Sequence, residues 1–218
     1  QGYRGWRGQG GAIMADAIRL SVRRCQFEGN SSGRGGAVDI WGGDCRVEEC
    51  RFLENVGVEG GALSASGPVT IDHCVFSRNV ATNEIYGSCP QCYGGVISVS
   101  GSGELVDVTI TDSPGEAAAL RLTGAGPFLL ARSALLFNSG GTVVRLDVAG
   151  TAAVTLQENL IAFNAGPIFR GDATPLDGAS CNIVWANTTD FWPAALDFRG
   201  TNGNQASDPL LCTAGALD

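Results

Sequence analysis

The stretch CRFLENVGVEGGALSASGPVTIDHCVFSRN, residues 50–79, contains the same short pattern twice. Cys50 is followed by Phe52 and Asn55, and a second set of cysteine, phenylalanine and asparagine begins at Cys74. A Gly-Gly-Ala-Leu element separates the two copies. A pattern that returns after about two dozen residues indicates stacked repeats, each of which buries its apolar side against its neighbours.

The repeat extends over the rest of the chain. An earlier copy has Cys25, Phe27 and Asn30. In the second copy Cys50 is followed by Phe52 and Asn55, and in the third Cys74 is followed by Phe76 and Asn79. Weaker copies begin at Val108, Ser133, Asn159 and Cys181, and in the last of these Asn187 falls one residue late. The glycine element keeps the same spacing at 10–13, 35–38, 60–63 and 94–97. One longer interval indicates an inserted loop at about 81–93.

Each repeat holds three short runs in which apolar and polar residues alternate, such as GALSAS, VTIDHC and CVFSRN. Alternation over a few residues predicts half-buried strands, and no segment has a helical period with caps. We therefore expect an all-β protein, a single-stranded parallel β-helix of about eight coils of roughly 24 residues, stacked ~4.8 Å apart. Residues 1–218 would form one domain, with a degenerate closing coil at about 181–212.

Stacking predicts three ladders of like side chains. Cys25, Cys50 and Cys74 would lie above one another, and Phe27, Phe52 and Phe76 would form an aromatic ladder inside the coil. Asn30, Asn55 and Asn79 would stack at a turn, where a short amide can hydrogen-bond the next coil and tolerates a left-handed backbone. The glycine pair would supply positive φ at another corner.

The composition excludes several classes of partner. The chain has 22 acidic residues against 14 basic ones, all of them arginine, and a net charge of −8. This balance argues against nucleic acid, which binds basic surfaces. No run of 18 apolar residues is present, so we expect no membrane span. Eight cysteines are compatible with an oxidising compartment.

The pairing of GGAI at 10–13 with F-x-x-N at Phe27–Asn30, Phe52–Asn55 and Phe76–Asn79 resembles the repeats of the chlamydial polymorphic outer-membrane proteins. It is also similar to the wider group of secreted bacterial right-handed parallel β-helix repeat proteins, whose closing coil the segment 180–212 resembles. The resemblance implies a right-handed β-helix and an extracellular or cell-surface location. Such families include adhesins, passenger domains and polysaccharide lyases.

The cysteines fall into three sets. Cys25, Cys45, Cys50 and Cys74 occupy inward positions, where we expect small buried apolar residues, because stacked coils are too far apart for a relaxed disulfide with Cβ atoms ~3.8 Å apart. Cys89 and Cys92 lie in the inserted loop and are candidates for a local disulfide. A second candidate, Cys181 with Cys212, would close the degenerate end.

Two outward columns raise the question of a binding site. One contains Met14, Asp39, Ser64, Ser98, Arg121, Arg145 and Arg170, and the other contains Asp16, Trp41, Ser66, Ser100, Thr123, Asp147 and Asp172. Arg121, Arg145 and Arg170 beside Asp147 and Asp172 could bind an acidic polymer, because arginine binds carboxylates with a planar fork. The alternative is a solvated charge face whose members compensate one another.

We expect a module without a catalytic residue, metal or cofactor, although the sequence does not settle whether the chain is an enzyme. The leading hypothesis is an extracellular or cell-surface structural or adhesive β-helix that assembles end to end with its own copies, since open end coils invite strand pairing. The alternative is a carbohydrate-active enzyme or binding domain for an acidic polysaccharide of the pectate-lyase-like kind. The expected partners are therefore further copies of the chain or a glycan.

Overall fold

The computed structural model describes residues 10–16, 19–82, 95–148, 153–171, 176–188 and 197–208. Three of the cysteines singled out above, Cys89, Cys92 and Cys212, lie outside these residues, as does Asp172. The described part of the chain contains strands and turns but no helix.

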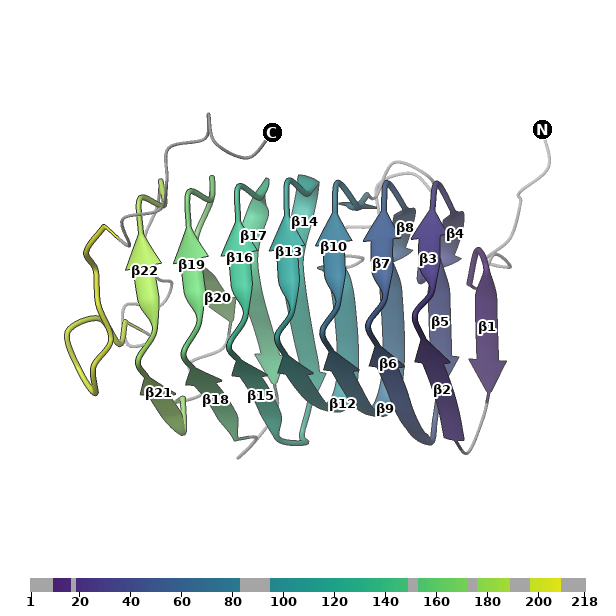
Figure 1. The fold of residues 1–218 in the computed structure, drawn as a ribbon, viewed down its shortest axis with the longest axis horizontal. Coiled ribbons are helices and arrows are strands. Elements are labelled where there is room, and N and C mark those ends of the chain that lie inside the picture. The colour runs from purple at the N-terminus through teal and green to yellow at the C-terminus, as the bar shows by residue number, and fades with distance from the viewer. Residues whose placement is uncertain are drawn as a thin grey trace.

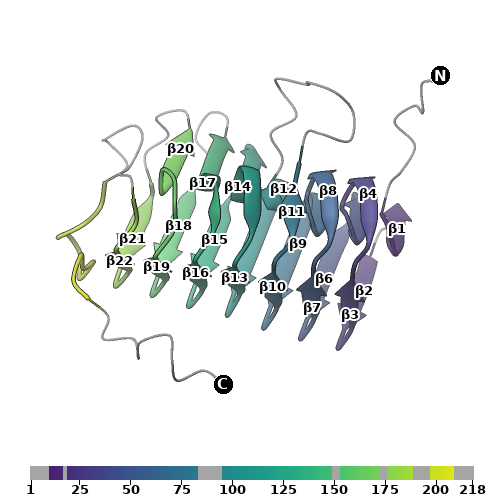
Figure 2. The same ribbon diagram turned by 90° about the horizontal axis from the view of Figure 1, so that it is seen from above.

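The strands form three parallel sheets that run along the molecule (Figures 1 and 2). The seven-stranded sheet contains β3 (Gln26–Glu28), β7 (Arg51–Leu53), β10 (Val75–Ser77), β13 (Thr109–Thr111), β16 (Ala134–Leu136), β19 (Leu160–Ala162) and β22 (Ile183–Trp185). The three-stranded sheet contains β4 (Ser31–Arg34), β8 (Val56–Glu59) and β11 (Val80–Ala81). Figure 2 shows these two sheets on opposite sides of the solenoid.

The twelve-stranded sheet has two halves that share long strands. The first half contains β1 (Ile13–Asp16), β5 (Val38–Trp41), β9 (Leu63–Asp72), β12 (Gly95–Val106), β14 (Pro114–Gly124), β17 (Ser139–Val148) and β20 (Phe169–Gly171). The second half adds β2 (Arg19–Arg23), β6 (Asp44–Glu48), β15 (Phe128–Ala131), β18 (Val154–Gln157) and β21 (Gly178–Ser180). Of these, β6 pairs with the later part of β9 and β15 with the later part of β12, while β2 pairs with β6, β18 with β15 and β21 with β18. All pairings between the described strands are parallel, so the predicted parallel β-solenoid is confirmed.

The expected number of coils was too high. Within the described residues the seven strands from β3 to β22 are separated by six turns, and the register from Phe27 to Phe52 gives a period of about 25 residues. An eighth coil is only begun, where Gln205 forms an isolated parallel bridge with Ile183.

The frame of the last full repeat also differs from the expected one. Leu160 pairs with Ile183, so the residue that continues the column of Asn159 is Asn182, not Cys181. With this frame Asn187 falls directly in register with Asn164. The apparent delay of one residue came from aligning on the cysteine.

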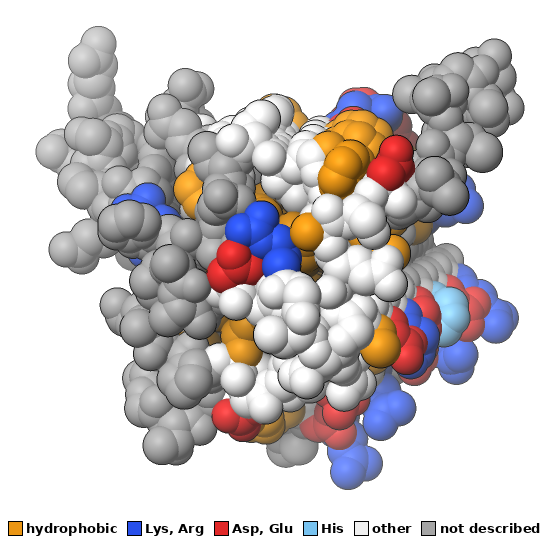
Figure 3. Space-filling view, turned by 90° about the vertical axis from the view of Figure 1, so that its left-hand side faces the viewer, with side chains coloured by type: hydrophobic (Ala, Val, Ile, Leu, Met, Phe, Trp, Pro, Cys, Tyr) orange, Lys and Arg blue, Asp and Glu red, His pale blue; other side chains and the backbone are white. Residues whose placement is uncertain are grey.

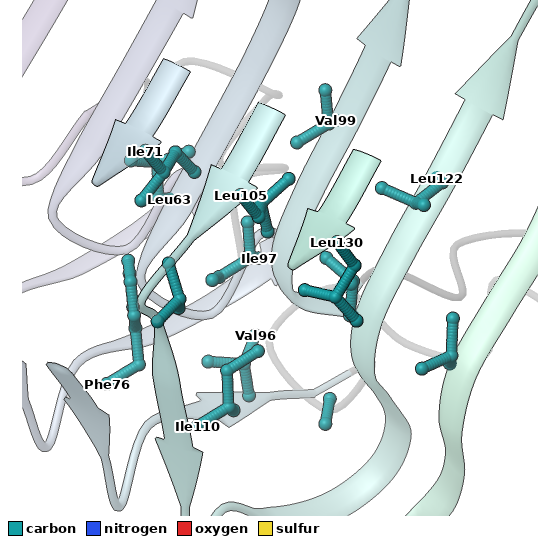
Figure 4. Packing of buried hydrophobic residues seen from close by; sticks show 14 of the residues in the cluster. Leu63, Ile71, Phe76, Val96, Ile97, Val99, Leu105, Ile110, Leu122 and Leu130 are labelled. Carbon is teal, nitrogen blue, oxygen red and sulfur yellow. The ribbon is translucent and has the colours of Figure 1, made fainter. Parts of the chain in front are cut away.

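Inward side chains fill the solenoid with one continuous core. Phe27, Phe52 and Phe76 stack with ring centroids 4.8 and 4.5 Å apart, which confirms the predicted aromatic ladder. Aliphatic residues such as Ile110 continue this column. Figure 4 shows how side chains from the different walls meet in the middle, where Leu63 is fully buried.

Two corner ladders connect one coil to the next. At one corner the side-chain oxygen of Asn79 accepts the backbone N–H of Asn55, and Asn55 does the same for Asn30. At the other corner the Cys50 sulfur accepts the backbone N–H of Cys25 at 3.5 Å, and the side-chain oxygen of Asn182 accepts that of Asn159 at 3.0 Å. Cysteine and asparagine therefore have the same role at this corner, because the side chain of each accepts a hydrogen bond from a backbone N–H of the preceding coil.

Candidate functional site

The outward columns predicted from the sequence are confirmed by the strand registers. Arg121 of β14 pairs with Arg145 of β17, which pairs with Arg170 of β20. Thr123 pairs with Asp147, so the carboxylate stands beside the arginine column. The further members of both columns, from Met14 and Asp16 to Ser98 and Ser100, follow in the registers of β1, β5, β9 and β12.

Asp147 holds two of the three arginines. Its Oδ2 lies 3.0 Å from the Nε of Arg121 and 2.8 Å from the Nε of Arg145. All three side chains are 19–26% exposed. The arginines on adjacent coils are therefore not left to repel one another, because a carboxylate lies between them. Arg170 is exposed one coil further along, and its predicted companion Asp172 is among the undescribed residues.

A third arginine-containing ion pair, which the sequence columns did not include, faces the same surface. Arg34, at the end of β4, has its Nε 3.0 Å from the Oε2 of Glu59 on the next coil. Its guanidinium carbon lies 4.2 Å from the ring centroid of Trp41, close enough for a cation–π contact. The pair was missed because it belongs to the three-stranded sheet, on the other side of the glycine corner.

A groove of about 280 Å³ extends from the Arg34–Glu59 ion pair to the Arg121–Asp147 ion pair. Arg34 and Glu59 line one part, and Arg121 and Asp147 line another. The remaining lining residues are Ala65 and four residues with hydroxyl groups, which lie on three neighbouring coils: Ser64, Ser98, Ser100 and Thr123. We call this surface the arginine groove.

Arg121 is held by one edge, since its Nε donates a hydrogen bond to the Oδ2 of Asp147. The Nε of Arg34 lies within ion-pair distance of Glu59 but forms no hydrogen bond with the described residues. The Nη1 and Nη2 atoms of Arg121 have no hydrogen-bond partner among the described residues, so this edge can receive a carboxylate of a ligand in the two-point geometry that arginine favours.

Asp39 lies in register with Ser64, one of the residues that line the groove. Its side chain is completely buried although it belongs to an outward column, and its Oδ2 accepts the indole N–H of Trp41 at 2.8 Å. Its Oδ1 has no hydrogen-bond partner among the described residues. Asp39 therefore fixes the edge of Trp41, against which Arg34 packs.

A second group of charged residues follows a corner of the solenoid. His73 places Nδ1 2.7 Å from Asp72 and Nε2 3.7 Å from Asp107, while Arg132 contacts both oxygens of Asp107. The hydrogen bond from Arg132 holds the pKa of Asp107 below its ordinary value. Figure 3 shows acidic, basic and histidine side chains following one another along this edge. Among the described residues only one group is spaced to hold a metal ion, and it consists of Asp72, His73 and Asp107. Both carboxylate oxygens of Asp107, however, already accept hydrogen bonds from Arg132.

Three of the four cysteines predicted to point inward are buried thiols. Cys45, Cys50 and Cys74 are buried, and Cys45 pairs with Leu20 and Val69 in the strand registers. Burial raises the pKa of the Cys74 thiol to about 12. Cys25 differs from the prediction, because it lies in the first coil of its column and is exposed.

No disulfide is formed among the described residues. Cys181 is an exposed free thiol, and its proposed partner Cys212 lies outside them, so this bond stays a prediction. The same holds for Cys89 with Cys92.

Comparisons of the chain with known protein families, with curated protein sequences and with solved structures find no match. The class that the fold defines is therefore the parallel β-solenoid, and the resemblance to chlamydial repeats rests on the sequence motifs alone. In the described residues no helix is long and apolar enough to cross a membrane.

Proposed function

We propose that this chain is an adhesive β-solenoid module, secreted or displayed at a cell surface, that binds an acidic glycan in the arginine groove. The observation that carries the proposal is the groove itself: two arginines, each in an ion pair with a carboxylate, flank a floor of hydroxyl groups. Arginine forks suit the carboxylates of a polyuronate, and the serine and threonine hydroxyls suit its hydroxyl groups.

The carboxylates of the groove favour binding over catalysis. Glu59 and Asp147 are each in an ion pair with an arginine, so both serve to position guanidinium groups. A glycosidase would instead need two carboxylates available for proton transfer or nucleophilic attack. The arginine groove resembles a clamp for a polymer that lies along the solenoid axis.

The test is calorimetric titration with a short oligogalacturonide and with a neutral galactose oligomer of equal length. We expect only the acidic ligand to bind, and Arg121→Gln to weaken binding about tenfold or more, since a charged hydrogen bond is lost. Arg132→Gln is the matched control, because it removes the same charge from an ion pair at the distant corner. Equal weakening by both variants would contradict the proposal.

Two further outcomes are decisive. Release of an unsaturated product from a polyuronate would replace the binding role with that of a lyase, the alternative expected from the sequence. Assembly with further copies of the chain is a separate prediction, which light scattering of the purified protein tests.

A further inference from the structure

A second and larger hollow, of about 450 Å³, lies on the outer face of the other half of the twelve-stranded sheet. It runs over strands β6, β9, β12, β15 and β18. Glycines separate it from the arginine groove: Gly67 and Gly101 adopt φ values of +120° and +125°, and a Cβ on Gly101 would lie 3.2 Å from the Cα of Gly67. The long strands therefore bend here, and the second hollow begins immediately after the bend. We call it the acidic hollow.

The floor of the acidic hollow is apolar and its rim carries negative charge. Pro68, Pro127 and Leu129 provide the outward apolar surface. The two carboxylates are those of Asp44 and Glu104, both exposed. The polar remainder consists of Thr70, Ser102, Thr155 and Gln157.

Unlike the acidic residues of the arginine groove, these two carboxylates have no basic partner. Neither Asp44 nor Glu104 forms an ion pair with any described residue. Arg19 of the preceding coil is in register with Asp44, and the register places Thr70 between Arg46 and Glu104. The hollow thus offers Glu104, which has no arginine in register beside it, and Asp44, which is not held in an ion pair, beside an apolar floor. The net charge of the chain is already −8.

We infer that the acidic hollow binds an extended peptide segment in which lysine side chains alternate with apolar ones. The carboxylates of Asp44 and Glu104 complement the lysine ammonium groups, and the prolines and Leu129 cover the alkyl stems. The hydroxyl and amide side chains can hydrogen-bond the peptide backbone. The occupant is a different protein, because this chain contains no lysine.

The lining favours a peptide over an amino sugar. Sugar rings usually bind through their C–H faces against an exposed aromatic ring. The only aromatic residue at the acidic hollow, Phe128, is 2% exposed and belongs to the core. The inference does not depend on the glycan proposal, since it concerns another wall and other residues.

The experiment is fluorescence anisotropy with a labelled hexapeptide of alternating leucine and lysine, and with the same peptide carrying glutamine for lysine. We expect binding of the lysine peptide only, and a loss of about tenfold in the double variant Asp44→Asn/Glu104→Gln. The control is Asp16→Asn/Glu28→Gln, which removes two equally exposed carboxylates on other strands. It should bind as the unaltered protein does.

Three results would overturn the inference. Equal losses in the two double variants would show unspecific attraction to the negative chain. Equal binding of the glutamine peptide would remove the role of charge. Tighter binding of a glucosamine oligomer than of the lysine peptide would assign the acidic hollow to a glycan instead. Circular dichroism of each variant confirms that its fold is retained.

Discussion

Replacement of Asn79 by alanine tests the corner ladder that joins the coils. Asn79 is fully buried, and its Oδ1 accepts both the backbone N–H and the side-chain amide of Asn55 at 2.9 Å. Its Nδ2 donates to the carbonyl of Phe52 at 2.8 Å. The substitution leaves the buried N–H of Asn55 without this acceptor, at a cost of roughly 1–3 kcal/mol, and removes two further hydrogen bonds of about 1 kcal/mol each.

We therefore expect Asn79→Ala to lower the free energy of unfolding by about 4 kcal/mol. For a domain of this size that corresponds to a fall in melting temperature of roughly 10 °C. The matched control is Asn30→Ala, at the start of the same ladder. The side-chain oxygen of Asn30 accepts no hydrogen bond from the described residues, so its loss orphans no buried N–H and should cost below about 1 kcal/mol.

The assay is urea unfolding of both variants, followed by circular dichroism and by tryptophan fluorescence, with coincident transitions required before the free energies are compared. Equal destabilisation by the two substitutions would refute the reasoning. It would mean that the ladder stabilises the fold through packing of the amide, which both variants lose, rather than through satisfied buried hydrogen bonds.

Two further predictions concern thiols and glycines. Because burial raises the pKa of Cys74 to about 12, above that of the unfolded thiol, its contribution to stability is complete below about pH 9 and is lost as the pH rises towards 12. In the native protein a thiol reagent should modify exposed Cys25 and spare Cys74. Gly101→Ala should destabilise by roughly 1–3 kcal/mol, because φ is +125° and the new Cβ would press against Gly67 of the preceding coil. Gly29→Asn should cost little, since a Cβ there meets nothing within 4 Å; equal losses would contradict the role of the bend.

The fold could be predicted because a repeat of constant length fixes the register. Once Phe27, Phe52 and Phe76 are recognised as one column, the outward residues on the same coil follow by counting, which is how Arg121 and Arg145 were placed side by side. The same reasoning failed at the last coil. Alignment on Cys181 ignored that the corner position needs a hydrogen-bond acceptor rather than a cysteine, and the side-chain oxygen of Asn182 accepts the backbone N–H of Asn159.

The candidate site could be predicted only in part, for a geometrical reason. Counting along one column finds residues on a single wall, whereas the arginine groove also uses Arg34 and Glu59 from the three-stranded sheet. The angle between two walls at a corner cannot be read from the length of the repeat. The burial of Asp39 beneath Trp41 was missed for the same reason.

The acidic hollow and the arginine groove lie on successive segments of the same strands, and their geometry predicts that they bind independently. Arg121 of the groove is in register with Ser98 of β12, and Glu104 of the hollow follows six residues later, which places these charges ~20 Å apart along an extended strand. This separation exceeds the Debye length of about 8 Å at physiological salt, so a bound cationic peptide should hardly attract an anionic glycan. Both segments also lie in one continuous sheet over a filled core, which leaves no bistable element to couple them.

The affinity for oligogalacturonide should thus stay within about twofold when the hollow is saturated with the lysine peptide, as expected when no coupling free energy links two sites. A larger change at physiological salt would show that the bend between them moves.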